Sequence, residues 1–398
     1  MSQHIGIIKL RSALSAGDKD LVGEASEFLS SLSPNGEYEF ENAGKGKMNV
    51  FLVLTGGSET SFKDFYKNYE APYFILPTGK RNSLAASLEI VSYLHEQGEP
   101  AILLYGEDQK KMLDGAVRVY NALHALRGAR LGVIGGSSSW LIASNIDRKK
   151  AKKALGIDIV DIPMREVLGY YDEHLLADDT LFSRFEGKTR RKEELREALY
   201  VHGALKKLVK TRGLSALTMK CFDLITAKQV SACLAFALLN EEGIIAGCEG
   251  DIPSALTMMI MQALTGEAPF MANPAYMDAE HSEAVYAHCT IPISMLTSYT
   301  LATHFESGLS FALRGQLKKT TFTAAKLSPA LDDIRGLSGE IIDNPIEDKM
   351  CRTQIKVRFN GSLKPLLEKP YGNHMIFSYG DYTEELGMLS ALLAHFCK

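Results

Sequence analysis

The order of apolar and polar positions predicts an α/β first half. Short apolar runs at residues 5–9, 49–57, 72–78 and 100–106 alternate with stretches of helical spacing such as "SLAASLEIVSYLHEQG". Apolar runs of this length that end in turn residues are typical of buried parallel strands. With helices between them, they give the βαβ rhythm of an open, doubly wound sheet.

The same rhythm restarts near residue 130, after a predicted helix at about 108–126. The segment "RLGVIGGSSSWLIAS" (130–144) predicts a strand, a double glycine and a Ser-rich helix start. Further strand-like runs follow at 157–163, 214–221 and 243–248, with a charged helical stretch at 187–212. We therefore expect a second α/β unit of the same kind.

From about residue 290 the pattern changes to short alternating segments separated by Gly, Pro or Asn. This is typical of an antiparallel β domain, and a final helix is predicted at about 383–397. The expected domains are an N-terminal Rossmann-like α/β domain (1–127), a second α/β domain carrying the metal-binding or catalytic carboxylate (128–288), and a C-terminal antiparallel β domain with its closing helix (289–398).

Composition and charge exclude several classes of function. The 398 residues are 46% apolar and 23% charged with a net charge of −4, which favours a globular protein without a nucleic-acid surface. The longest apolar run, at about 255–264, is far shorter than the roughly 20 residues that span a bilayer, and the N-terminal apolar run is too short for a signal peptide. The six cysteines form no CxxC pair, so we expect a reducing cytoplasm and no membrane partner.

Two acids stand at the junction of a buried strand and a buried helix in "GCEGDIPSALTMMIMQALTG" (247–266). Glu249 and Asp251 follow the carboxyl end of the strand, which is where ligands bind in open α/β sheets. Asp251 is well placed to cap the following helix, with Pro253 tolerated in its first turn. Glu249 is a poor cap without an obvious cation nearby, so it is the stronger candidate for a functional carboxylate.

Other candidate site residues can be explained by a structural role as well as by a functional one. His374 in "YGNHMIFSYGD", His288 at the end of an apolar run and Glu306 beside a glycine turn could each be structural or solvated residues. Lys80 and Arg81, in "PTGKRNS", form a surface turn or meet an anionic group. The loop "GGSSSW" could hold an anion at a helix start, but it lacks the lysine and the glycine spacing of nucleotide-binding loops.

Several motifs in order resemble the L-fucose/L-arabinose isomerase superfamily, especially its shorter fucose isomerase-like members. They are "MKCFD", "CEGDIPSALTMMIMQALTGEAPFMANP", "YAHC", "THFESG", "RGQL", "CRTQ", "GNHMIFSYGD" and, earlier, "LGVIGGSSSWLIAS". The resemblance implies two Rossmann-like domains, a C-terminal antiparallel β-barrel and a metal-dependent aldose–ketose isomerase. It also implies Mn²⁺ or another divalent cation, held by two carboxylates and a histidine, and a homo-oligomer, either a trimer or a hexamer, whose sites a neighbouring subunit can complete.

Carried over residue by residue, the resemblance gives Glu249 and His374 as metal ligands. The second carboxylate falls in "FMAN", where this chain has Asn273, and a second histidine is replaced by Met375. An asparagine offers a carbonyl oxygen to a metal but cannot take up a proton. Candidates for binding the substrate are His288, Glu306, Trp140, Lys80 and Arg81.

These residues predict isomerisation of a sugar through an enediol, with Glu249 as the base and Asp251, Glu306 or a metal-bound water moving the hydroxyl proton. A first alternative is an anionic sugar, such as sulfoquinovose or a phospho-sugar, whose charge would meet Lys80, Arg81 and the loop 135–139. A second alternative is a sugar-binding or regulatory protein that kept the scaffold and lost catalysis through Asn273 and Met375.

Overall fold

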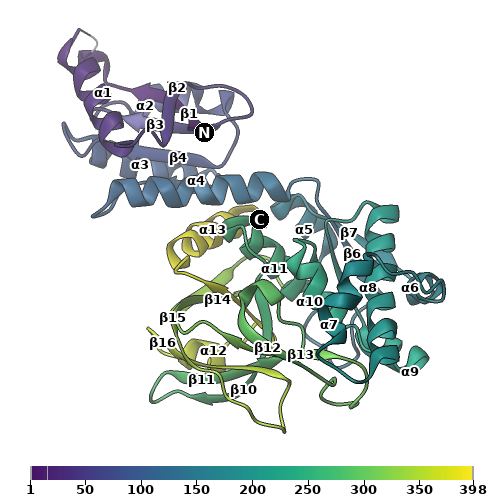
Figure 1. Cartoon of the computed structure of the whole chain (residues 1–398). Helices are drawn as coiled ribbons and strands as arrows, with labels where there is room; N and C mark the ends of the chain where they lie inside the picture. Colours follow the sequence, from purple (N-terminus) through teal and green to yellow (C-terminus); the bar gives the residue numbers. More distant parts are fainter. Residues whose placement is uncertain (1, 16, 397–398) are drawn as a thin grey trace. The chain divides into compact units, whose positions relative to one another are not determined.

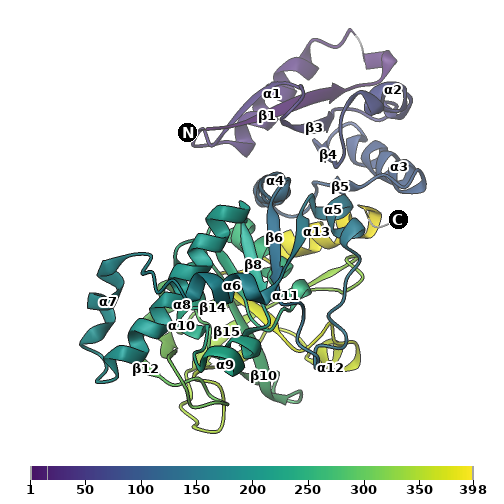
Figure 2. The ribbon, with the colours of Figure 1, turned by 90° about the vertical axis from the view of Figure 1, so that its right-hand side faces the viewer.

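The structure is a computed structural model that describes residues 2–15 and 17–396. The chain divides into two compact units. The first is formed by the chain up to Asn121 together with the segment from Gly387 onward, and the second is Ala122–Leu386. Figure 1 follows the chain from purple to yellow, and Figure 2 gives the view after a quarter turn.

The first unit is a parallel sheet with helices. Among the described residues its five strands follow the order β2-β1-β3-β4-β5, the order of flavodoxin-like folds. The apolar runs predicted as strands are confirmed, and they are buried because both faces of a parallel sheet are covered. One edge strand, β2, has the polar sequence "YEFEN" and gave no such signal. The elements are β1 (Gln3–Leu10), α1 (Asp20–Leu32), β2 (Tyr38–Asn42), β3 (Met48–Val53), α2 (Glu59–Phe65), β4 (Tyr73–Pro77), α3 (Ser83–Glu96) and β5 (Ala101–Leu103). The helices α4 (Gln109–Leu126) and α13 (Thr383–Phe396) belong to this unit up to Asn121 and from Gly387, and their remaining residues to the second unit.

The second unit begins with another parallel sheet, whose four strands among the described residues run in the order β7-β6-β8-β9. The strands are β6 (Arg130–Ile134), β7 (Asp158–Ile162), β8 (Ala216–Met219) and β9 (Ile245–Gly247). Its helices are α5 (Arg148–Leu155), α6 (Met164–Tyr171), α7 (Asp179–Glu186), α8 (Lys192–Arg212), α9 (Cys221–Lys228), α10 (Cys233–Glu241) and α11 (Ile252–Thr265). Both views show α6, α8 and α10 side by side, as their contacts require.

The rest of this unit is antiparallel. Six strands, as far as the described residues show, close into a barrel in the order β10-β11-β16-β15-β14-β17. They are β10 (Phe270–Asp278), β11 (Glu283–His288), β14 (Thr321–Leu327), β15 (Ile334–Asp343), β16 (Thr353–Phe359) and β17 (Met375–Tyr379). A separate hairpin joins β12 (Leu296–Ala302) and β13 (Ala312–Leu317), and α12 spans Lys364–Glu368. Helix α11 packs against β9 of the parallel sheet and β14 and β17 of the barrel, so it links the two sheets.

The fold class predicted from the sequence is confirmed: two parallel α/β units precede a closed antiparallel barrel. The barrel already uses β10 and β11, which lie before residue 289, and the two predicted domain boundaries stay a prediction. No helix in the described part of the chain combines the length and the apolar character that crossing a bilayer requires.

The predicted helix start after Gly135-Gly136 is wrong. The chain forms turns and loop here, and the next helix, α5, begins only at Arg148. Both glycines have a positive φ, 73° and 80°, and the N–H of Ser138 donates to the carbonyl oxygen of Glu249 at 2.8 Å. This backbone donor therefore holds a neighbouring loop and is not available to an anion.

Candidate metal centre

Glu249 lies in a short loop between β9 and α11 that another loop holds in place. Its φ of 63° is in the left-handed region, which few residues other than glycine adopt. Besides the bond from Ser138, Ser137 Oγ donates to the carbonyl oxygen of Gly250 at 2.8 Å. A Cβ on Gly250 would lie 2.2 Å from the carbonyl oxygen of Gly136. The two glycine-containing loops therefore approach more closely than any side chain at 250 would allow.

Asp251 caps helix α11, as the sequence predicted. Its Oδ1 accepts a hydrogen bond from the Ser254 N–H at 2.9 Å, and its Oδ2 accepts one from Ser254 Oγ at 2.8 Å. Oδ2 also accepts a hydrogen bond from His374 Nδ1 at 2.8 Å. Asp251 and His374 are both 0% exposed. The carboxylate therefore fixes the imidazole ring, and its role as a catalytic group stays a prediction.

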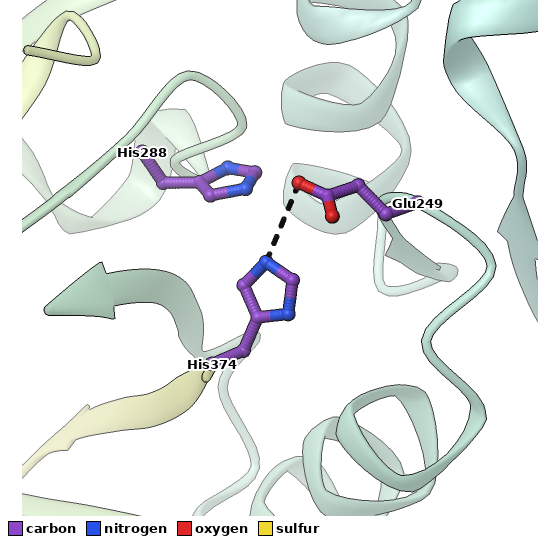
Figure 3. Close-up of side chains that lie close together, drawn as sticks. All are labelled: Glu249, His288 and His374. Atoms are coloured by element: carbon purple, nitrogen blue, oxygen red, sulfur yellow. Dashed lines mark ion pairs between the residues drawn. The ribbon is translucent and has the colours of Figure 1, made fainter. Parts of the chain in front are cut away.

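Three side chains from separate elements converge on one point (Figure 3). Glu249 from the β9–α11 loop, His288 from the end of β11 and His374 from just before β17 each present a ligand atom within 4.8 Å of the others. Glu249 Oε1 is 3.6 Å from His374 Nε2, and this nitrogen is buried without a hydrogen-bond partner. His288 is held from its other side, because Nδ1 shares a hydrogen bond with Thr290 Oγ1 at 2.8 Å.

The electrostatics of the three groups are linked. Burial acts to raise the pKa of Glu249, but the ion pair with His374 and the hydrogen bond from Trp140 outweigh it and bring the pKa to about 2. Burial acts to lower the pKa of His374, yet the hydrogen bond to Asp251 and the ion pair with Glu249 raise it. Burial and the neighbouring His374 lower the pKa of His288 to about 4. At neutral pH Glu249 is thus ionised and His288 is neutral.

This donor set fits a divalent cation. Carboxylate oxygen and imidazole nitrogen suit Mn²⁺ and other first-row ions, and a ligating histidine usually donates its second N–H to a carboxylate. His374 has this arrangement, with Nδ1 bonded to Asp251 and Nε2 left without a hydrogen-bond partner, 3.6 Å from Glu249 Oε1. A buried polar atom in this state calls for an unseen partner. Glu249, His288 and His374 are therefore the residues that would hold the ion.

An aromatic side chain borders the cluster. Trp140 Nε1 donates to Glu249 Oε2 at 2.7 Å, while the residue is 49% exposed. Its ring meets Phe222 edge to face at 5.0 Å, and Phe222 in turn contacts the ring of His304. His304 Nε2 lies 3.2 Å from an oxygen of Glu306, which is half exposed. Trp140 thus touches the cluster directly, and Glu306 is reached from it through two intervening rings.

Asn273 lies next to the cluster in the barrel. Ala272 on β10 pairs with Met375 on β17. Because the strands are antiparallel, Asn273, which follows Ala272, and His374, which precedes Met375, come next beyond this pair. The amide oxygen of Asn273 accepts a hydrogen bond from Asn373 Nδ2 at 2.9 Å. Ligation of a metal by Asn273 stays a prediction.

Lys80 and Arg81 belong to the first unit and lie before α3. The guanidinium of Arg81 forms ion pairs with Asp18 and Glu24, at 2.9 and 2.8 Å. The two carboxylates therefore already neutralise the charge of Arg81, which the sequence analysis had proposed as a contact for an anionic substrate. A contact of either residue with a sugar stays a prediction.

The sequence did not identify two residues that support the site. Lys326, on β14, lies in the alternating segment "TTFTAAKL" and looks like a solvent-facing lysine, yet it is 2% exposed. Thr290, which orients His288, lies in an ordinary turn sequence. Their roles depend on contacts with residues far away in the chain, which spacing does not encode.

Comparison with known proteins points to sugar isomerases. Proteins named sulfoquinovose isomerase from Priestia aryabhattai and Priestia megaterium are each 24% identical over 338 residues, which cover 78% of this chain and 74% of theirs. One from Alkalicoccus urumqiensis is 23% identical over 336 residues, with the same coverage. No family model matches the chain. A solved structure of D-threo-3-hydroxyaspartate dehydratase from Delftia sp. HT23, 9% identical, covers 97% of this chain and 85% of its own with a TM-score of 0.15, too low to carry an argument.

Proposed function

We propose that this chain is a metal-dependent aldose–ketose isomerase that acts on an anionic sugar of the sulfoquinovose type. The observation that carries the proposal is the convergence of Glu249, His288 and His374, with the buried Nε2 of His374 lacking a hydrogen-bond partner. Relatives named sulfoquinovose isomerase, matched over three quarters of their length, support both the reaction and the substrate class. Membership of the wider L-fucose/L-arabinose isomerase superfamily is part of the same proposal.

The chemistry requires a proton to move between neighbouring carbon atoms of an open-chain sugar. A bound divalent cation, which we propose to be Mn²⁺, would polarise the carbonyl and hydroxyl oxygens of those carbons. Glu249 is the group placed to take the proton from one carbon and return it to the next, because it is ionised at neutral pH. Its Oε2 is oriented by the indole N–H of Trp140, and its Oε1 faces His374.

Trp140 is the residue best placed to receive the sugar ring or chain. Its indole is half exposed yet bonded to the carboxylate that would act as the base. Aromatic faces bind the apolar C–H surface of a ligand while their polar edge makes a hydrogen bond. We therefore assign Trp140 to substrate positioning. His288 is assigned to the metal, although the sequence offered it as a substrate-binding residue.

A panel of sugars in D₂O tests the proposal. With Mn²⁺ present, we expect deuterium to enter at C2 of sulfoquinovose, followed by NMR, and less or none with neutral aldoses. Glu249→Gln keeps the size of the side chain and removes the base, so exchange should be lost. Lys80→Ala serves as the matched test of the predicted anion contact and should harm only anionic substrates.

The outcomes separate the proposal from its rival. Sugar binding without exchange, in protein loaded with Mn²⁺, would favour a binding or regulatory protein. Absence of both Mn²⁺ binding and exchange would refute the isomerase. Light scattering on the same samples tests the homo-oligomer, trimer or hexamer, that accompanies the proposal.

A further inference from the structure

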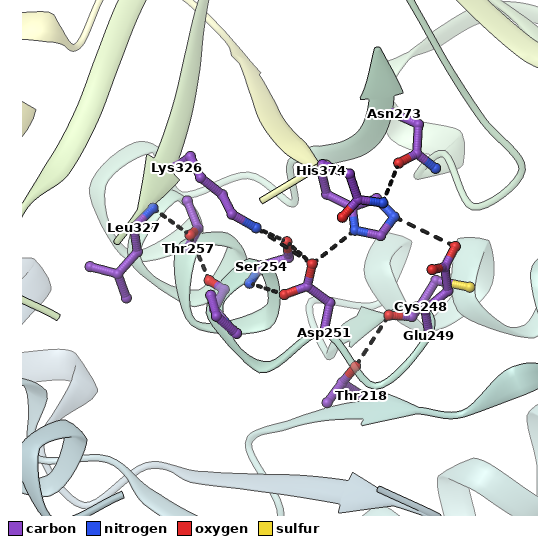
Figure 4. A network of polar contacts seen from close by, with 12 residues as sticks. Thr218, Cys248, Glu249, Asp251, Ser254, Thr257, Asn273, Lys326, Leu327 and His374 are labelled. Carbon is purple, nitrogen blue, oxygen red and sulfur yellow. Dashed lines mark hydrogen bonds and ion pairs between the residues drawn. The ribbon is translucent and has the colours of Figure 1, made fainter. Parts of the chain in front are cut away.

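A chain of buried polar groups runs from the barrel to the metal cluster (Figure 4). Lys326 Nζ donates to Ser254 Oγ at 2.5 Å and lies 3.4 Å from Asp251 Oδ2. The same Oδ2 accepts from His374 Nδ1, whose ring then presents Nε2 toward Glu249. Lys326, Asp251 and His374 are 2%, 0% and 0% exposed.

A buried lysine calls for an explanation. Removing an ammonium from water costs several kcal/mol, and a single carboxylate at this depth would be just as costly without a cation. Lys326 is the cation that the structure places against Asp251. The neighbouring residue, Leu327, is fixed as well, because its N–H donates to Thr257 Oγ1 of α11 at 3.0 Å. Strand β14 is thereby tied to the first turns of the helix that Asp251 caps.

We propose that Lys326 is a positioning residue of the metal centre: by compensating the charge of Asp251, it keeps that carboxylate bonded to His374 Nδ1 and so holds Nε2 open for the metal. The inference rests on the metal site of the proposed function. The polar contacts of Lys326 are with Asp251 and Ser254 and not with Glu249 or His288, so this lysine acts through Asp251. Without the ammonium, the carboxylate loses one of the groups that fix it and can shift from the position in which it accepts from His374 Nδ1.

The test compares three variants of the full-length protein with a matched control. Lys326→Met keeps the length of the side chain and removes the charge, and Asp251→Asn removes the opposite charge. The double variant removes both, so it leaves no buried charge without a partner. Lys319→Met is the control, because Lys319 is a half-exposed lysine whose partner, Asp343, is also on the surface.

Each variant is measured for unfolding and for Mn²⁺ affinity. The single variants should unfold earlier than the wild type, since each leaves one buried charge unpaired. The double variant should recover stability close to that of the control while its Mn²⁺ affinity stays about 10- to 100-fold below wild type, the usual effect of losing a group that orients a ligand. A stable double variant that binds Mn²⁺ as tightly as wild type would show that Lys326 and Asp251 serve folding alone.

A second measurement is independent of metal binding. In the metal-free protein, ¹⁵N NMR of His374 at a pH where the ring is neutral should show the proton on Nδ1 in the wild type and a mixture of tautomers in the Lys326→Met variant. Identical tautomers in both proteins would overturn the inference. If the wild type binds no Mn²⁺ at all, the proposed function fails, and this NMR comparison still decides the role of Lys326.

Discussion

Replacing Gly250 by alanine tests whether the close approach of two loops holds Glu249 in place. Gly250 has a φ of +69°, and an added Cβ would meet the carbonyl oxygen of Gly136 at 2.2 Å and Ser137 Cα at 2.7 Å. Both neighbours are backbone atoms, so neither can rotate away as a side chain would. The loop carrying Glu249 must shift away from the 135–138 loop.

Two costs add in this variant. A Cβ in the left-handed conformation costs about 1–2 kcal/mol, and forcing extra atoms into a packed contact costs about 1–3 kcal/mol more. Gly250→Ala should therefore lower the free energy of unfolding by about 2–5 kcal/mol. Gly266 is the matched control: it ends the same helix with a φ of +79° and has nothing within 4 Å of its Cβ position. Gly266→Ala should cost only the first amount.

Urea unfolding of the two variants can be followed by tryptophan fluorescence, because Trp140 is the single tryptophan of the sequence and contacts Glu249. Mn²⁺ titrations on the folded variants should show weaker binding for Gly250→Ala and unchanged binding for Gly266→Ala. Equal costs for the two variants, with equal Mn²⁺ affinity, would refute the reasoning that the loop contact positions Glu249.

Three further predictions concern single side chains. Trp140→Phe keeps an aromatic ring but removes the hydrogen bond to Glu249. The kcat/KM for the sugar should fall about tenfold, the equivalent of one hydrogen bond to a charged group, while the unfolding midpoint stays unchanged. An unaltered kcat/KM would contradict the role given to the indole. Asn273→Asp adds a carboxylate beside the cluster, and Mn²⁺ affinity by titration calorimetry should rise; an unchanged affinity would place this residue outside the metal's reach. Burial acts to raise the pKa of Glu242, but hydrogen bonds from His202 and a lysine outweigh it and lower the pKa. Because the folded-state pKa is lowered, the stability from this carboxylate is present above its ordinary pKa and is lost as the pH falls below it. Glu242→Gln should thus flatten the acid side of the stability–pH curve, by about 0.5 kcal/mol after allowance for solvent screening, and a curve identical to wild type would exclude the contribution.

The sequence by itself determined most secondary-structure elements and the part of the site formed by Glu249 and Asp251. Apolar runs located most strands of both parallel sheets, because strands buried on both faces need side chains that are apolar throughout. The junction "GCEGD" placed Glu249 and Asp251 at the carboxyl end of a strand, and the helix cap by Asp251 followed from its distance to the helix. These features depend on neighbours within a few residues, which local spacing records.

Only the tertiary structure decided how the site is assembled. Asp251 and His374 are 123 positions apart and Lys326 is 75 positions from Asp251, yet they form one buried network. Nothing in the sequence singled out Lys326, and the loop after Gly136 was predicted to start a helix; in both cases a contact with the Glu249 loop or its helix decided the structure. Burial and pairing of charges depend on which distant segments pack together, so they become visible only when the barrel closes against helix α11.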